Sequence, residues 1–316
     1  MRNSCHAWLL VVCIRFTCSY SAKEAVVYPE LVEGRSSNER KILKISEDIV
    51  LTLEPKPAFD ELFSVTGFNE DGTEINYHER GSDYNERLFV DYSQQASVMI
   101  YQDPDLLVHG IIGEDVRIQP TAADEKSRGG HRAHVLSRQE VKDDLRHHLD
   151  FAGSSPFATA RDESASTIKF SGERSGEVVK LRPEIHLVVD STLYQQFGNS
   201  TSQVFQSYGA VLNAVNLHLD TITTLDVDAK ITGFTVNRNL TQELYLSYEF
   251  FEDTLFVNDM ETLKRFGSHV RTDRSHTYST SDIVFLITGA IRNIGLIPPS
   301  AGSRTKTSGS RSLKKS

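Results

Sequence analysis

Between residues 183 and 289 the hydrophobic period of the chain changes repeatedly, and this limits the possible architectures more than any other part of the sequence. A short apolar run at Glu184–Asp190 suits a strand that is covered on both faces. Apolar residues at three- and four-residue spacing from Val204 to Ile222 predict a long amphipathic helix. A strand at Asp226–Asn237, a helix at Asn258–Val270 and a strand at Asp282–Gly289 follow. Alternating strands and helices predict an α/β unit around a mainly parallel sheet.

The second of these helices carries its own start signal. Asn258 is a residue type that caps helices, and Glu261 lies three positions later, as in a capping box. Leu263, Phe266 and Val270 are spaced to form the buried stripe of this helix.

Residues 23–137 have a different pattern and predict a β-rich first domain. Lys41–Ile45 and Ile49–Leu53 alternate as half-buried strands do. Asn69–Thr73 has the composition of a turn, in which Gly72 can adopt a positive φ. No helix is expected before Arg138. Further strands are expected at Glu86–Tyr92, Ala96–Tyr101, Leu106–Ile112, Val116–Ile118 and His134–Leu136.

The amino terminus has the three parts of a secretory signal. Arg2 precedes the apolar run Ala7–Ile14, and small residues follow. We therefore predict a signal peptide over residues 1–22, with cleavage between Ser21 and Ala22; the alternative is a buried strand or helix at the amino terminus. The apolar run is too short to span a bilayer. The chain is accordingly expected to be secreted and extracellular.

All three cysteines of the chain, Cys5, Cys13 and Cys18, fall inside this predicted signal. The secreted chain is then expected to have no disulfide and to depend on its hydrophobic core. Two N-glycosylation sequences follow, and they make Asn199 and Asn239 candidate acceptors. Such triplets also occur by chance.

Two polar stretches mark the remaining boundaries. Residues 138–182 are rich in Ser, Gly and charged residues and predict a linker. Residues 290–316 contain six basic residues and no acidic one, and we expect them to be disordered. This tail is suited to bind anionic glycans, or it is a foreign terminus from a shifted reading frame or a retained intron.

Composition excludes several classes of protein. A net charge of −9 argues against nucleic-acid binding. The sequence has no G-x-S-x-G nucleophile motif, no P-loop and no Rossmann glycine set. After the predicted signal no segment has the length and apolarity of a membrane span.

The order of these elements resembles the first half of a reprolysin (ADAM-like) catalytic domain. Arg182–Tyr194 resembles its opening strand, Ile231–Phe234 its second strand, Asp259–Arg271 the helix before the third strand, and Asp282–Gly289 that third strand. In the first domain, Val26–Glu30, Gly110–Gly113, Val116–Pro120 and His131–Leu136 resemble a reprolysin prodomain. The pattern is most similar to the secreted salivary reprolysins of blood-feeding ticks. The resemblance implies a β-rich prodomain followed by an incomplete α/β metzincin-type catalytic domain over residues 183–289.

The same resemblance implies zinc as a cofactor, but the chain lacks the residues that would bind it. The family uses an H-E-x-x-H helix with a third His, and no such motif occurs here. We interpret the pairs His131/His134, His147/His148 and His269/His276 as ordinary solvated or hydrogen-bonded histidines. A calcium site is not expected, because His186 stands where family members often place a Glu, although Asp282 matches a second ligand.

The resemblance also implies a secreted zinc metalloendopeptidase that acts on extracellular proteins. The catalytic motif is absent, so we expect this chain to be truncated and inactive as written. No basic processing run precedes Pro183, which leaves Arg182 as a weak candidate for prodomain processing. The alternative is a secreted protein without enzymatic activity, built on the prodomain, that serves as a decoy, inhibitor or binding protein.

Overall fold

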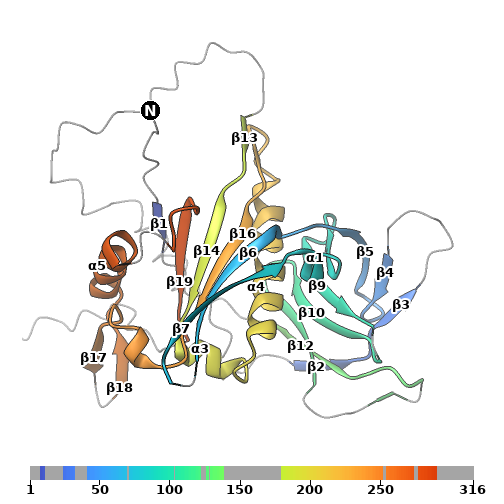
Figure 1. Ribbon diagram of the computed structural model, residues 1–316. Coiled ribbons are helices and arrows are strands. Elements are labelled where there is room, and N and C mark those ends of the chain that lie inside the picture. The colour runs from blue at the N-terminus through green and yellow to red at the C-terminus, as the bar shows by residue number, and fades with distance from the viewer. Residues whose placement is uncertain are drawn as a thin grey trace, which may run out of the picture.

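The computed structural model of the chain (Figure 1) describes residues 8–10, 24–32, 41–69, 71–102, 104–121, 126–127, 129–138, 179–251, 254–273 and 277–289. This part of the chain is β-rich and has few helices. It contains a nine-stranded sheet, a six-stranded sheet and two pairs of short strands. Most strand pairs among the described residues are antiparallel. The predicted linker and basic tail lie almost entirely outside the described residues.

The nine-stranded sheet is antiparallel throughout and belongs to the first part of the chain. Its strands follow the order β2-β12-β11-β10-β9-β8-β5-β4-β3. Each strand predicted in this region is present, with ends shifted by up to two residues. Their inward-facing side chains, among them Leu43, Leu51 and Val98, form a core that is separate from the rest of the molecule. The strands are β2 (Glu24–Val27), β3 (Glu30–Val32), β4 (Lys41–Lys44), β5 (Val50–Pro55), β8 (Leu88–Asp91), β9 (Ala96–Tyr101), β10 (Leu107–Ile112), β11 (Val116–Pro120) and β12 (His134–Arg138).

The six-stranded sheet has the order β1-β19-β14-β16-β6-β7 and is mainly parallel. The three strands predicted from residues 183–289 lie side by side and pair in parallel, as expected. Only β7 runs antiparallel, against β6. The strands are β1 (Trp8–Leu10), β6 (Phe59–Phe68), β7 (Glu74–Arg80), β14 (Glu184–Val189), β16 (Lys230–Val236) and β19 (Ile283–Ile287).

Strand β1 lies inside the predicted signal peptide. It pairs in parallel with β19, from Trp8 opposite Ile283 to Leu10 opposite Phe285. The predicted cleavage residues Ser21 and Ala22 are outside the described residues, so the signal peptide stays a prediction.

Strands β6 and β7 are the main departure from the sequence analysis. They belong to the predicted first domain, yet β6 pairs in parallel with β16 of the second. The turn between β6 and β7 is the predicted one, with Gly72 at a φ of 85°. The hydrophobic period identifies a strand but does not identify its partner, and here the partner is far away in the chain.

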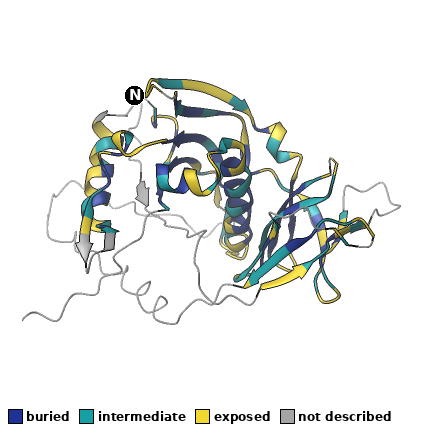
Figure 2. Ribbon diagram, turned by 90° about the horizontal axis from the view of Figure 1, so that it is seen from below, coloured by how far each residue is buried: buried dark blue, intermediate teal, exposed yellow. Residues whose placement is uncertain are grey.

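Helix α4 (Thr201–Leu219) lies between the two large sheets (Figures 1 and 2). Val204, Tyr208 and Leu212 of the predicted stripe are buried, whereas Val215 is 43% exposed. The helix begins three residues earlier than the predicted stripe, at Thr201. Ser200 caps it, and its hydroxyl oxygen accepts from the Gln203 backbone N–H at 3.3 Å. Side chains from both sheets pack on α4 in one continuous core.

The predicted cap of helix α5 (Asp259–Ser268) is confirmed, but the predicted capping box is not. The Asn258 side chain accepts from the backbone N–H of Glu261 at 2.8 Å. The Glu261 carboxylate does not complete a capping box but accepts from Arg265 Nε at 2.9 Å, one turn later. Phe266 and Val270 are buried as expected.

Several short elements were not predicted from the sequence. Helix α1 is a single turn, so the expectation of no helix before Arg138 was wrong, since a turn of four residues shows no apolar period. These elements are α1 (Ser82–Asn85), α3 (Ser191–Gln196), the 3₁₀ turn η2 (Leu240–Gln242), the π-helical turn η3 (His269–Asp273), strand β13 (Val179–Leu181), and the hairpin β17 (Tyr248–Phe251) and β18 (Thr254–Val257). The strand predicted at Asp226–Asn237 is interrupted and forms two strands, β16 and β15 (Leu225–Val227), of which β15 pairs in parallel with β13.

Candidate functional site

The carboxyl ends of β14, β16, β19 and β6 meet at one edge of the parallel sheet, because these four strands run in the same direction. Open sheets with parallel strands commonly bind ligands outside these ends. Polar residues follow directly after three of the strands: Asp190 after β14, Asn237 after β16 and Thr288 after β19. This edge is therefore the candidate site.

Asp190 joins the ends of two strands to the start of a helix. It caps α3, and its Oδ1 accepts from the backbone N–H of Leu193 at 2.7 Å and of Gly289 at 3.1 Å. Its other oxygen accepts from the Thr288 hydroxyl. Because Asp190 is fully buried, these donors replace the water that its carboxylate would otherwise bind.

Glu243 is the second buried carboxylate at this edge and enters from the loop after η2. It accepts from the backbone N–H of Ser191, and from the Ser191 hydroxyl at 3.1 Å. Burial raises the pKa of Glu243 to about 7, and the negative charge of Asp190 adds to the rise, while the two hydrogen bonds oppose it. Glu243 can therefore exchange a proton near neutral pH, a property of many catalytic acids and bases but also of buried structural acids.

A groove of about 530 Å³ opens on the same side of the molecule. Tyr245 and His269 lie together in it, with ring centroids 5.0 Å apart, and the Tyr245 hydroxyl accepts from Asn237 Nδ2 at 2.7 Å. Glu243 does not line the groove. The lining comes from the β6–β7 turn, from η2 and the loop after it, and from the end of α5: Phe68, Gly72, Thr241, Gln242, Leu244, Tyr245, Arg265, Ser268 and His269.

The inner end of the groove narrows to a polar slot of about 10 Å³ between Thr66, Thr235 and Tyr278. A single buried water needs about 10–15 Å³, so the slot holds at most one. A ligand the size of a side chain or larger would have to lie in the outer part. There Leu244 is 81% exposed and supplies an apolar contact.

His186 occupies the position at which the resemblance places a calcium ligand. It is buried, its Nε2 lies 2.9 Å from Thr235 Oγ1, and its ring packs edge-on against Tyr278. Burial lowers its pKa to about 3, so the ring is neutral. The second candidate ligand, Asp282, accepts from the Glu184 backbone N–H at 3.0 Å. A neutral imidazole in the core cannot replace a calcium-binding carboxylate.

The other histidines that the structure describes do not form a zinc site. His134 is buried, and its Nε2 accepts from the Val108 N–H at 2.9 Å while its Nδ1 lies 3.0 Å from the Arg132 carbonyl. Both ring nitrogens are thus occupied, as the interpretation of a hydrogen-bonded histidine predicted. His147, His148 and His276 lie outside the described residues. Within those residues no three His, Cys, Asp or Glu side chains come together as metal ligands, so the residues present do not fit zinc.

Arg182, the candidate processing residue, follows β13 and is held by Asp226. Its Nη1 and Nη2 each donate to one Asp226 carboxylate oxygen at 3.1 Å, and Nη1 also donates to the Leu181 carbonyl at 2.8 Å. The bond after Arg182 leads to Pro183, whose nitrogen carries no hydrogen. Processing here stays a prediction, and a protease would first have to detach the side chain from Asp226.

Both candidate glycosylation residues are exposed in loops. Asn199 lies between α3 and α4 with a φ of 57°. Asn239 caps η2, and its Oδ1 accepts from the Thr241 N–H at 3.0 Å. Thr241 lines the groove, so a glycan on Asn239 would lie at the groove's rim.

The sequence analysis did not identify Glu243, Tyr245 or the groove. Asp190 could have been found as the acidic residue at the carboxyl end of a buried strand and the start of a helix. Glu243 lies in a polar loop, where nothing in the local sequence distinguishes it from a solvated acid.

Comparison with known proteins relates part of the chain to a metalloproteinase. The chain is 32% identical over 111 residues to venom metalloproteinase BumaMPs1 of Olivierus martensii. The match covers 34% of this chain and spans only 28% of the length of that protein. No family model matches the chain. In the part of the chain that the structure describes, no helix has the length and apolarity to cross a membrane.

Proposed function

We propose that this chain is a secreted relative of the reprolysin zinc metalloendopeptidases, with a prodomain over residues 23–137 and the first part of a metzincin-type catalytic domain over residues 183–289. The observation that carries the proposal is the similarity to a venom metalloproteinase. The observed succession β14, α4, β16, α5 and β19 agrees with the order of elements expected from the resemblance. Its natural targets would be extracellular proteins.

This chain by itself is not expected to hydrolyse peptide bonds. The rings of His134 and His186 are hydrogen-bonded, and that of His269 packs against Tyr245. Within the described residues, no three potential ligands come together. The decisive measurement is the zinc content of the purified secreted chain, together with casein and gelatin cleavage with and without a chelator. We expect no stoichiometric zinc and no chelator-sensitive cleavage. One zinc per chain with chelator-sensitive cleavage would show that our interpretation of the histidines is wrong.

Secretion and glycosylation can be tested in the same preparation. Expression in insect cells should deliver the chain to the medium with Ala22 as its first residue. Asn199→Gln and Asn239→Gln should each remove the mass of one glycan, with a chain that has both substitutions as the unglycosylated reference. Retention in the cells with residues 1–22 intact would contradict a signal peptide.

The alternative function, a decoy or inhibitor without enzymatic activity, is favoured by the hairpin of β6 and β7. This hairpin lies along the edge of β16 and so covers a strand of the catalytic-type sheet. Added to a purified venom metalloproteinase, the chain should then reduce casein cleavage in a saturable manner. Unchanged cleavage at a large molar excess would exclude this function for that enzyme.

A further inference from the structure

The contact between the two halves of the chain has the character of a protein core. We call residues 24–138 the amino-terminal segment and residues 179–289 the carboxyl-terminal segment. Phe59 and Phe63 of β6 are 2% and 0% exposed. The Phe63 ring lies 5.2 Å from Phe205 and 5.9 Å from Phe234, centroid to centroid. These aromatic rings from both segments form one cluster on α4 and β16.

Backbone pairing joins the same two segments. Val65 and Thr66 of β6 stand opposite Phe234 and Thr235 of β16 in parallel register. Without β6, the edge of β16 would present unpaired backbone groups above an apolar surface. β6 therefore covers this edge of β16, and β7 lies outside it at the end of the sheet.

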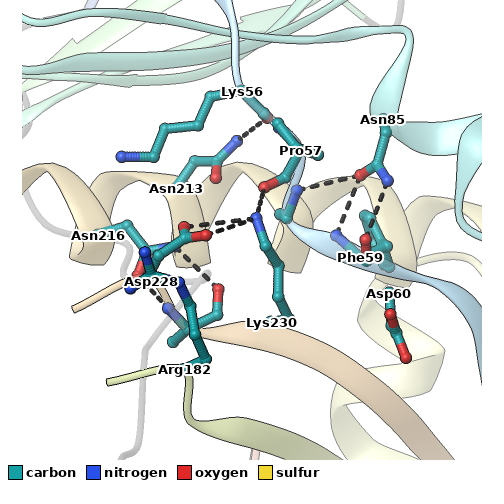
Figure 3. Close-up of polar contacts among 12 residues, drawn as sticks. Lys56, Pro57, Phe59, Asp60, Asn85, Arg182, Asn213, Asn216, Asp228 and Lys230 are labelled. Carbon is teal, nitrogen blue, oxygen red and sulfur yellow. Dashed lines mark hydrogen bonds and ion pairs between the residues drawn. The ribbon is translucent and has the colours of Figure 1, made fainter. Parts of the chain in front are cut away.

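A polar junction fixes the entrance to β6 (Figure 3). Lys230 Nζ donates to the Pro57 carbonyl at 2.5 Å, and Asn213 Nδ2 donates to the Lys56 carbonyl at 2.6 Å. The Ile231 N–H donates to the Ala58 carbonyl at 2.8 Å. The residues joined by the two side-chain bonds are 173 and 157 positions apart in the chain. This junction orients β6 toward β16 before the aromatic residues begin.

Two glycines of the carboxyl-terminal segment lie where an added Cβ would meet atoms of the amino-terminal segment. Glycine in the middle of a helix lowers the stability of the helix relative to alanine, yet Gly209 lies inside α4. A Cβ at Gly209 would lie 2.5 Å from the Phe59 ring. A Cβ at Gly233 would lie 2.6 Å from Ser64 Oγ and 2.3 Å from His186 Nδ1. Gly209 is therefore suited to the presence of β6, whereas Gly233 makes room for His186 of its own segment as well as for Ser64 of β6.

We propose that the amino-terminal segment is an integral binding partner of the carboxyl-terminal segment, so that the two remain one non-covalent complex when the chain between them is cut. The partner surface is the edge of β16 together with the face of α4 around Gly209. Cleavage of the connection would therefore not release the segment that resembles a prodomain. This inference concerns the packing of the chain and does not depend on peptidase activity.

The test uses the full chain with a site for a specific protease inserted near residue 160. After complete cutting, gel filtration with light scattering at micromolar concentration should give one species with the mass of both pieces. The pieces should separate only in denaturing urea. Two separate species in native buffer would overturn the proposal.

Substitutions locate the interface. Gly209→Ala should weaken the association of the cut pieces about 10- to 100-fold, since the added methyl group would overlap the Phe59 ring. Val215→Ala, at an exposed position of the same helix, is the matched control and should have no effect. Equal association of both variants would contradict the proposed surface.

A measurement on the uncut chain covers the case in which Gly209→Ala fails to fold. Amide hydrogen exchange should protect Val65 and Thr66 of β6 to the same degree as Phe234 and Thr235 of β16, because the strands open together. Exchange in β6 that is orders of magnitude faster than in β16 would show that β6 is a detachable strand and would overturn the proposal.

Discussion

Glu243→Gln should change the pH dependence of stability in a defined direction. The folded protein holds the pKa of Glu243 at about 7 instead of its ordinary 4.5. Between these pH values the folded chain binds more protons at this site than the unfolded chain, so this site lowers the free energy of unfolding as pH rises. A tenfold change in proton affinity corresponds to about 1.4 kcal/mol, so the full loss is at most about 3 kcal/mol. This decrease in the free energy of unfolding is complete above pH 7.

Glutamine cannot ionise, but its oxygen can still accept from the Ser191 N–H. The variant should therefore match the wild type near pH 4 and become more stable than it, by up to about 3 kcal/mol, at pH 8. Urea unfolding at a series of pH values measures both proteins. The difference between them is the relevant quantity, because burial lowers the pKa of His109 and His186, and these groups change stability in the opposite sense.

Glu61→Gln is the matched control, since Glu61 lies exposed on β6. Its stability profile should run parallel to that of the wild type. If the profiles of Glu243→Gln and wild type also run parallel from pH 4 to pH 8, then Glu243 is not buried beside Asp190 as described. The assignment of an ionisable group at the carboxyl edge of the sheet would then fail.

Three further substitutions test other parts of the fold through urea or thermal unfolding. Asp190→Ala should lower the free energy of unfolding by about 2–4 kcal/mol, because it removes the cap of α3 and leaves buried donors without an acceptor. A decrease below about 0.5 kcal/mol would argue against this role of Asp190. His134→Leu should lower the free energy of unfolding by about 1–3 kcal/mol, because it leaves the Val108 N–H without an acceptor. An unchanged unfolding midpoint would mean that water satisfies this N–H. Gly72→Ala should lower the free energy of unfolding by about 1–2 kcal/mol, because the φ of Gly72 is positive. Gly67→Ala is the control and should have no such effect, because the added methyl makes only ordinary contacts. Equal effects of the two substitutions would mean that the turn has another conformation.

Local features of this chain were predictable from the sequence, and long-range ones were not. The stripe of α4 and the cap of α5 involve residues within one or two helical turns, so their spacing is visible in the sequence. The alternation of the antiparallel strands is local in the same sense. By contrast, nothing near Phe59–Phe68 indicates that this strand pairs with β16, because a period of two specifies a buried face and leaves the partner open.

The candidate site was less predictable than the fold for a related reason. The shifted pKa of Glu243 comes from its burial and from Asp190, which is more than fifty residues earlier in the chain. The groove is lined by three separate stretches that meet only after folding. The lack of an H-E-x-x-H motif is, by contrast, visible in the sequence itself, because that motif is a local pattern.

The pairing of β6 with β16 also has a consequence for biosynthesis. Lys230 and Pro57, which meet at the start of this pairing, are 173 residues apart, and ribosomes add roughly 5–20 residues per second. The aromatic strand β6 therefore waits roughly 10–30 s after its own synthesis before β16 exists. Such non-local pairing slows folding, and an unpaired apolar strand favours aggregation. Production of this protein should therefore depend on how well the chaperones of the cell shield β6 during that interval.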